Sequence, residues 1–220
     1  MNSAKKFIKA VLQAIFGNKF LIYIIPGNRP VVALTFDDGP GVHTPEILDI
    51  LKNKGVKATF FMIGENAEGK HDFVKRVHDE GHVIANHTYD HVQLSKYSYD
   101  KQKDEIQKTN DILKGIISGL NVHWFRPPYG DYNDDTMKVL GELGMERVLW
   151  NVDPRDWSGV QADAILDNVL SNAKDGSIVL MHDGVANSSE TAKALPKIID
   201  GLRDKGYKLV TVSEIKGYSK

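Results

Sequence analysis

The sequence predicts an α/β fold in which parallel strands alternate with outer helices. From residue 31 onward, short apolar runs of strand length alternate with longer segments that carry a helical period. A glycine follows each helical segment, where a left-handed cap favours a residue without a Cβ atom, and an apolar run begins soon afterwards. These glycines are Gly55, Gly81, Gly119, Gly144, Gly176 and Gly206. Right-handed crossovers make the strands parallel, so either an open doubly wound sheet or a nearly closed barrel would fit.

Each predicted element follows from its local pattern. The first strand, 31–36, is a short apolar run, and the first helix, 45–54, carries its apolar residues at helical spacing. The remaining strands are predicted at 57–61, 82–85, 122–125, 147–150, 177–181 and 207–212. The remaining helices are predicted at 72–80, 100–118, 133–143 and 161–174, and in a last segment that ends near Lys205. The charged run 100–111 is interpreted as the solvated face of its helix.

Composition limits the class of protein. The chain has 220 residues, 41% of them hydrophobic, with 28 Lys and Arg against 29 Asp and Glu and a formal charge of -1. These values predict one soluble globular domain and argue against a nucleic-acid partner, which needs a concentrated basic surface. The absence of cysteine excludes disulfides, thiol nucleophiles and cysteine-ligated zinc. Any metal must therefore be held by histidine, carboxylate or backbone oxygen.

Residues 1–30 are interpreted as an N-terminal extension. Lys5, Lys6 and Lys9 precede a partly apolar stretch, as in the first part of a secretory signal. Further charges interrupt the stretch and no cleavage site of the usual kind follows, so an amphipathic helix or an anchor is an equal alternative. Contact with a membrane is expected only through this extension. We expect a monomer in an extracytoplasmic or cell-envelope location, with the cytoplasm as the alternative.

Polar clusters follow five of the predicted strands. They are Asp37 to Pro40, Asn86 to His91, Arg126 to Gly130, Asn151 to Trp157, and the pair His182 and Asp183. In both candidate architectures the loops that follow the strands gather at one end of the sheet, and the reactive groups lie there. The five clusters are therefore expected to converge on one site.

Two histidines and one carboxylate of these clusters fit a metal site. His87 and His91 are four residues apart, so a helical turn over this stretch would place both imidazoles on one face. Asp38, at a neighbouring strand end, completes the set. Two histidines and a carboxylate leave coordination positions open for water and substrate, as a catalytic site requires. Zinc is expected as the ion, with cobalt, nickel and manganese as alternatives.

The same clusters carry a family resemblance. The segments TFDDGP (35–40), HTYDH (87–91), RPPYG (126–130), DPRDW (153–157) and LMHD (180–183) resemble, in order, five motifs of the NodB-homology polysaccharide deacetylases, the family-four carbohydrate esterases. The resemblance spans about residues 31–215 and implies a deacetylase domain over 31–220. It also implies a distorted (β/α)7 barrel and a metal-dependent hydrolase that removes acetyl groups from sugars, usually from N-acetylglucosamine polymers.

Amide hydrolysis requires an activated water, a stabilised oxyanion and a proton for the departing amine. We interpret Asp37 as the general base. Successive side chains of an extended segment diverge, so Asp38 can bind the metal while Asp37 faces the water. Arg126 would form a fork with Asp37 that keeps the base ionised and aimed.

His182 is the candidate general acid, which would protonate the sugar nitrogen. A carboxylate that orients the ring also favours the imidazolium form. Either Asp153 or Asp156 could supply it, and the family resemblance favours Asp156.

Four further residues are interpreted as substrate contacts. Tyr129 would donate its backbone N–H to the oxyanion and touch the sugar with its ring, and Pro128 stiffens the same loop. Leu180 and Trp157 match family positions that line the slot for the acetyl methyl group.

The function that these residues support is N-deacetylation of an acetylated polysaccharide, with peptidoglycan or chitin-like oligomers as substrates. An O-acetyl esterase acting on xylan is an alternative, because the same machinery cleaves esters. A non-catalytic sugar-binding relic and a metal hydrolase of small nitrogenous rings are further alternatives. The motifs do not select among the sugar polymers.

Overall fold

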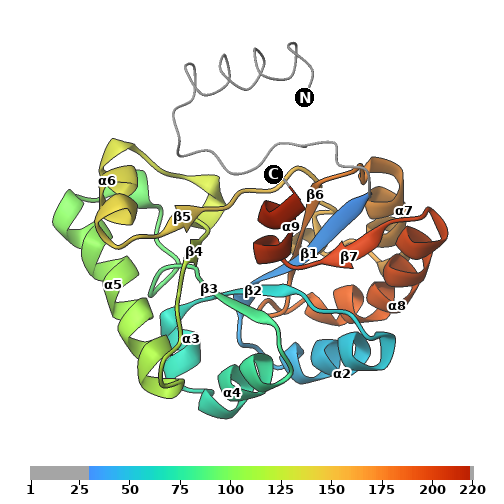
Figure 1. Cartoon of the computed structure of the whole chain (residues 1–220), viewed down its shortest axis with the longest axis horizontal. Coiled ribbons are helices and arrows are strands. Elements are labelled where there is room, and N and C mark those ends of the chain that lie inside the picture. The colour runs from blue at the N-terminus through green and yellow to red at the C-terminus, as the bar shows by residue number, and fades with distance from the viewer. Residues whose placement is uncertain (1–29, 219–220) are drawn as a thin grey trace.

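The computed structural model describes residues 30–218 and shows a curled sheet of parallel strands surrounded by helices (Figure 1). The strands are β1 (Val31–Gly39), β2 (Thr59–Met62), β3 (Val83–Asn86), β4 (Trp124–Phe125), β5 (Glu146–Arg147), β6 (Ser177–His182) and β7 (Lys208–Val210). They lie in the order β5-β4-β3-β2-β1-β6, and β7 pairs with β1. The predicted α/β fold is confirmed, and each predicted strand overlaps an observed one.

β1 is the centre of the sheet because three strands pair with it. β6 pairs along one edge of β1, while β2 and β7 share the other edge, β2 at its end and β7 at its start. A parallel bridge between Val152 and Val179 joins the segment after β5 to the free edge of β6. The sheet therefore curls into the distorted, nearly closed barrel that the family resemblance implies, and the open doubly wound alternative is wrong.

Helices cover the outside of the curled sheet. They are α2 (Thr44–Lys54), α3 (Gly64–Glu68), α4 (His71–Asp79), α5 (Tyr99–Ile116), α6 (Asp134–Glu142), α7 (Ala162–Asn172), α8 (Ser188–Asp204) and α9 (Val212–Tyr218), with the 3-10 turns η1 (Leu94–Lys96), η2 (Pro128–Gly130) and η3 (Asp156–Ser158). The predicted helices are all present. The sequence did not predict α3 and α9, because segments of 5 and 7 residues are too short to establish a helical period.

Alternation along β1 separates two apolar cores. Val32, Leu34 and Phe36 belong to the large core between the sheet and the outer helices. Val31 and Ala33, which point to the opposite face, belong to a smaller cluster on the concave side. Side chains farther along β1 that continue this second row therefore point into the barrel.

α9 packs against the end of the barrel at which the strands begin. Val212 and Ile215 belong to the concave-side cluster, and the Trp124 indole donates a hydrogen bond of 2.7 Å to Ser213 Oγ. This end is filled by apolar side chains. Polar groups of the barrel interior are therefore placed toward the other end, where the strands finish.

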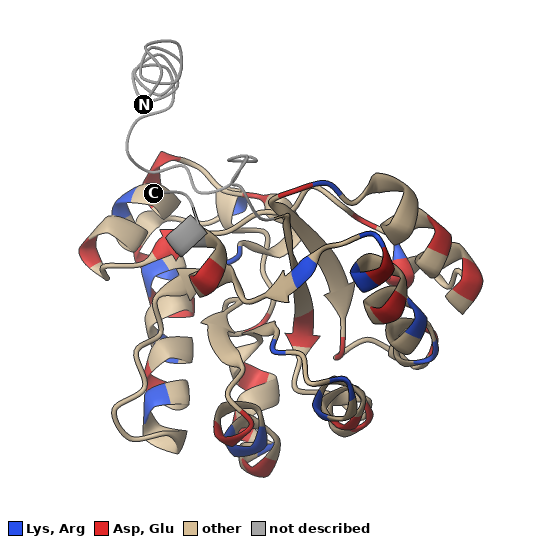
Figure 2. Cartoon of the chain, turned by 45° about the vertical axis from the view of Figure 1, so that its right-hand side comes forward, with Lys and Arg blue, Asp and Glu red and all other residues tan. Residues whose placement is uncertain are grey.

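Charges of both signs are interspersed over the outer helices (Figure 2). This mixture agrees with the balanced composition of the chain. Within residues 30–218, no helix is both long enough and apolar enough to cross a membrane. The predicted extension over 1–30 lies outside the described residues, apart from Pro30.

The glycines that were predicted to end helices all have a positive φ, from 61° at Gly55 to 84° at Gly206. Gly55 ends α2 with its N–H bonded to the carbonyl oxygen of Lys52 at 3.0 Å. No heavy atom lies within 4 Å of the position that a Cβ at Gly55 would occupy. A side chain here would therefore meet backbone strain and no steric clash with neighbours.

Gly55→Ala should lower the free energy of unfolding by about 1 kcal/mol, because an L-residue is strained in the left-handed region. Gly115→Ala is the matched control, since Gly115 lies inside α5 and a Cβ there also has open space. Alanine favours a helix, so this variant should be more stable by roughly 0.5 kcal/mol. Urea unfolding of both variants measures the difference, and equal changes of the same sign would contradict the assignment of Gly55 as a left-handed cap.

Candidate active site

The side chains of β1 that point into the barrel continue into the site. Thr35 and Asp37 are in register with Leu180 and His182 of β6, so the two strands place two layers of side chains side by side. All four residues are buried. Asp37 and His182 are thus neighbours at the open end of the barrel, although 145 positions separate them in the chain.

Asp38 interrupts the regular geometry at the end of β1. Its φ is 69°, and the pairing of β1 with β2 shifts register between Asp37 and Gly39. The bulge therefore turns the Asp38 carboxylate toward the neighbouring loop, away from the position that simple alternation along a strand would give. Gly184 lets its backbone pack closely on the backbone of Asp38, because a Cβ at Gly184 would lie 1.9 Å from the Asp38 carbonyl oxygen. Asn66 holds the same carbonyl with a hydrogen bond of 2.8 Å.

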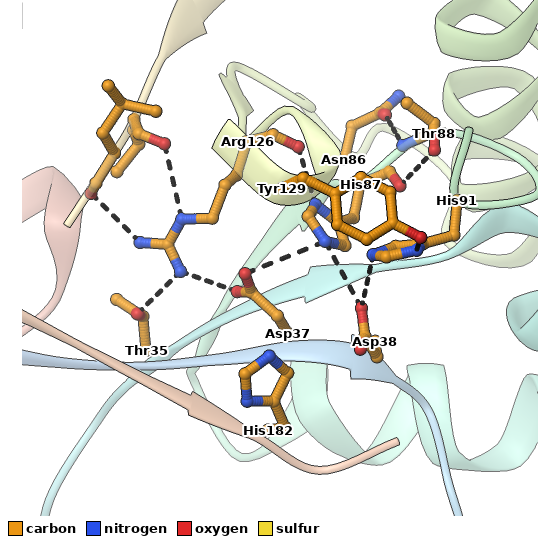
Figure 3. Close-up of polar contacts among 12 residues, drawn as sticks. Thr35, Asp37, Asp38, Asn86, His87, Thr88, His91, Arg126, Tyr129 and His182 are labelled. Carbon is orange, nitrogen blue, oxygen red and sulfur yellow. Dashed lines mark hydrogen bonds and ion pairs between the residues drawn. The ribbon is translucent and has the colours of Figure 1, made fainter. Parts of the chain in front are cut away.

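His87 and His91 face Asp38 from the loop that follows β3 (Figure 3). Their Nε2 atoms lie 3.3 and 3.2 Å from Asp38 Oδ1. The predicted helical turn is wrong, because Thr88 and His91 have φ values of 67° and 61°. Left-handed residues bring the two imidazoles together, with ring centroids 5.1 Å apart.

The second nitrogen of each imidazole also has a partner. His87 Nδ1 lies 2.6 Å from the carbonyl oxygen of Arg126, and His91 Nδ1 lies 3.2 Å from the hydroxyl of Tyr129. A carbonyl can only accept, so His87 carries a proton on Nδ1, and Nε2 is the ring atom that faces Asp38. Partners of this kind orient the histidine ligands of metal sites.

The three side chains fit a divalent cation. One oxygen of Asp38 and one nitrogen of each histidine all lie within 4.8 Å of one another. Asp38 Oδ1 is buried and has no hydrogen-bond partner among the described residues. Burial acts to raise the pKa of Asp38, but the two imidazoles outweigh it and hold that pKa well below its ordinary value. An ionised oxygen and two imidazole nitrogens form the donor set of open catalytic metal sites.

Asp37 has a different partner. Arg126, fully buried, donates from one terminal nitrogen to Asp37 Oδ1 at 2.6 Å and to Thr35 Oγ1 at 2.9 Å. The contact is a single nitrogen rather than the predicted fork, because the other guanidinium nitrogens lie 3.3 and 3.4 Å from backbone carbonyls after β5. Burial lowers the pKa of Arg126, and Asp37 opposes that effect. The second oxygen of Asp37 is directed toward His87, 3.8 Å from its Nε2.

His182 is paired with Asp156, and Asp153 is not its partner. His182 Nδ1 lies 2.7 Å from Asp156 Oδ1, whereas Asp153 accepts a hydrogen bond from the backbone of Arg155. Asp156 is fully buried and also accepts hydrogen bonds from His182 N and Thr191 Oγ1. Burial of His182 opposes its charge, but Asp156 outweighs that effect, and together with more distant carboxylates raises the pKa of His182 to about 9.

The predicted substrate contacts differ in exposure. Tyr129, with a φ of 60°, and Trp157 are 68% and 46% exposed, so neither ring is part of the core. Leu180 is 4% exposed, and Pro128 is buried. Trp150 was missed by the sequence analysis. A Cβ at Gly130 would lie 3.4 Å from its ring, which therefore supports the loop that carries Tyr129.

Asp183 has a structural role that the sequence analysis did not assign. Thr44 Oγ1 donates to its Oδ2, and its backbone N–H donates to the Asp37 carbonyl at 3.1 Å. A Cβ at Gly39 would lie 2.4 Å from its carboxylate. Burial, with the charges of Asp38 and Asp37, raises the pKa of Asp183 to about 7. Its position directly after His182 was the available signal in the sequence.

The interpretation of 100–111 as a solvated face is wrong for one side of α5. The polar residues Gln102, Glu105, Thr109 and Asn110 of that helix are buried. Glu105 accepts hydrogen bonds from the backbone N–H groups of Tyr89 and Asp90, and Asn110 accepts one from Asn86. This side of α5 therefore contacts the loop that carries His87 and His91.

Known proteins resemble this chain in sequence and fold. The profile of the family described as Polysaccharide deacetylase matches residues 25–148. A peptidoglycan-N-acetylglucosamine deacetylase of Bacillus cereus is 45% identical over 197 residues, which cover 89% of this chain and 71% of that protein. A chitooligosaccharide deacetylase of Sinorhizobium fredii is 39% identical over 191 residues, which cover 82% and 89%. The crystal structure of a peptidoglycan N-acetylglucosamine deacetylase, 45% identical, superposes with a TM-score of 0.83 over 86% of this chain and 89% of that one.

Asp156→Asn in the metal-free protein should lower the pKa of His182 from about 9 toward its ordinary value of 6.5, because the paired charge is lost. In the wild type, the ion pair stabilises the fold fully below pH 6.5, and this contribution disappears as the pH rises through about 9. NMR titration of the His182 ring measures the shift. Asp153→Asn is the control, and a midpoint that stays near 9 in Asp156→Asn would contradict the role of Asp156.

Proposed function

The chain belongs to the polysaccharide deacetylase family and is a polysaccharide N-deacetylase, and we propose that it uses a divalent metal. We further propose that it removes acetyl groups from N-acetylglucosamine in peptidoglycan or chitin-like oligomers. The observation that carries the proposal is the convergence of the Asp38, His87 and His91 donors beside Asp37, at the open end of the barrel. The named substrates of both relatives support this choice of polymer. A polymer of the cell envelope also favours an extracytoplasmic location.

Asp38, His87 and His91 would hold the metal. When bound, the cation would lower the pKa of a water molecule and polarise the acetyl carbonyl. Two of the three are oriented by their neighbours, since Asn66 holds the backbone of Asp38 and the Arg126 carbonyl holds His87. The proximity of the three donor atoms, all within 4.8 Å of one another, supports this assignment.

Asp37 would act as the general base. Its Oδ1 is occupied by Arg126, while Oδ2 is directed toward the metal ligands and is positioned to accept a proton from the attacking water. The buried guanidinium holds the Asp37 side chain in one orientation and is its counter-charge. A base held in one orientation contributes about 10²–10⁴-fold to such a reaction.

His182 would act as the general acid. Asp156 keeps the imidazole protonated at neutral pH, and the opposite ring nitrogen, Nε2, remains to donate a proton to the departing sugar nitrogen. Asp37 and His182 are in register on adjacent strands. The base and the acid therefore approach the scissile bond from neighbouring positions, as proton removal and proton delivery in one reaction require.

The remaining contacts would bind the acetyl group and the sugar. Tyr129 would donate its backbone N–H to the developing oxyanion, and the turn that contains Pro128 fixes its position. Leu180 lies two residues before His182 on β6, in register with Thr35. It would contact the acetyl methyl group together with Trp157. The exposed rings of Tyr129 and Trp157 offer flat apolar surfaces to a sugar.

Asp37→Asn should retain zinc affinity and lose about 10²–10⁴-fold in kcat, because the base is removed while the ligands stay. The asparagine oxygen can still accept from Arg126, which protects the fold. His91→Ala should lose both zinc affinity and turnover. Acetate release and zinc titration measure the two properties, with Asp153→Asn as the matched control that changes neither. Wild-type turnover in Asp37→Asn would disprove the base assignment, and loss of zinc there would place Asp37 among the ligands.

Substrate choice is tested by acetate release from peptidoglycan, chitin oligomers and acetylated xylan with defined metals added to the metal-free protein. We expect release from an N-acetylglucosamine polymer that depends on added metal. Release from acetylated xylan alone would support the esterase alternative. Zinc binding without release from any of the three polymers would support the sugar-binding relic.

A further inference from the structure

The loop between the two histidine ligands needs outside support. Thr88 and His91 both have left-handed φ values, and this conformation is strained for residues other than glycine. A strained conformation of this kind persists only where surrounding contacts determine it. Residues 88–90 connect His87 to His91 along the chain, so the conformation of these three residues sets the distance between the two imidazoles.

Hydrogen bonds satisfy the backbone of residues 88–90. The carbonyl oxygens of Thr88 and Tyr89 accept from the N–H groups of Gly64 and Glu65 in the first turn of α3, both at 2.9 Å. The N–H of Thr88 donates to the Asn86 side chain at 2.9 Å. These contacts fix one side of the loop and its first residue.

Glu105 binds the two remaining N–H groups. A single carboxylate oxygen, Glu105 Oε2, accepts from Tyr89 N at 3.0 Å and from Asp90 N at 3.2 Å. The side chain is fully buried, and its other oxygen accepts from Lys101 Nζ at 2.6 Å. A buried carboxylate is costly unless hydrogen bonds compensate it, and the loop donates two such bonds to Glu105.

The position of Glu105 is set by a rigid element. It lies within α5, which packs against α3 and β3 on the side of the barrel that carries the histidines (Figure 1). Both α3 and α5 therefore hydrogen-bond to the backbone of residues 88–90. Truncation of Glu105 would remove the acceptor of two part-buried N–H groups and would loosen the strained loop.

We propose that Glu105 is a positioning residue for the metal site, which acts through the backbone of Tyr89 and Asp90 to hold His91 against Asp38 and His87. This inference rests on the proposed metal site. It assigns Glu105 no contact with the metal or the substrate. Its effect is expected on metal affinity, because outer residues that orient ligands typically change affinity by about 10–100-fold.

The test is zinc affinity of the metal-free folded protein, measured by competition with a chromophoric chelator. Glu105→Ala should weaken zinc binding by about 10–100-fold. Leu113→Ala is the matched control for lost packing, because Leu113 is a buried core residue of the same helix, two turns further along. It should lower thermal stability and leave the zinc affinity of the folded protein within about threefold of wild type.

Glu105→Gln separates the hydrogen bonds from the charge. Its amide oxygen can accept both loop N–H groups, so zinc affinity should return to within about threefold of wild type although the pair with Lys101 is lost. Weak binding in Glu105→Gln, or wild-type affinity in Glu105→Ala, would overturn the proposal. If Glu105→Ala does not fold, Glu105→Asp replaces it, since the shorter side chain cannot reach the loop from α5. A wild-type protein that bound no zinc would contradict the metal site itself.

Discussion

Two carboxylates placed side by side in a buried pocket repel each other, and neither can be fully solvated. Asp37 and Asp38 can be neighbours because each has its own cationic or polar partner. Arg126 pairs with Asp37, while His87 and His91 face Asp38. The bulge that gives Asp38 a φ of 69° makes this separation possible, because it turns one carboxylate out of the inward row of β1. The proposed division of roles between base and metal ligand rests on that geometry.

Arg126 connects the two halves of the site. Its guanidinium contacts Asp37, while its carbonyl oxygen accepts from His87. A fully buried cation requires compensation, and Thr35 and the carbonyls after β5 provide it together with Asp37. Arg126, directly after β4, thus orients the proposed base through its side chain and a proposed ligand through its backbone carbonyl.

The sequence was informative where local chemistry determines structure. Glycine is favoured at a left-handed helix end, so Gly55 and its equivalents marked the repeating units, and parallel strands bring their ends together, so the polar clusters could be placed at one site. The spacing of His87 and His91 was misleading. Four residues also fit a loop, and that loop depends on contacts with α3 and α5 that no local pattern reveals. Glu105 was missed for the same reason, because a buried polar residue on a charged helix has no signature in hydrophobic periodicity.

We propose that Asp38, and not Asp37, joins the two histidines around a metal. The most direct measurement is a crystal structure of the zinc-loaded protein with anomalous data collected at the zinc edge. The account predicts one strong peak with Asp38, His87 and His91 as protein ligands at about 2.0–2.2 Å. Asp37 should remain outside the coordination sphere and hydrogen-bonded to Arg126. A zinc ion coordinated by Asp37, or a peak away from the two histidines, would contradict the account.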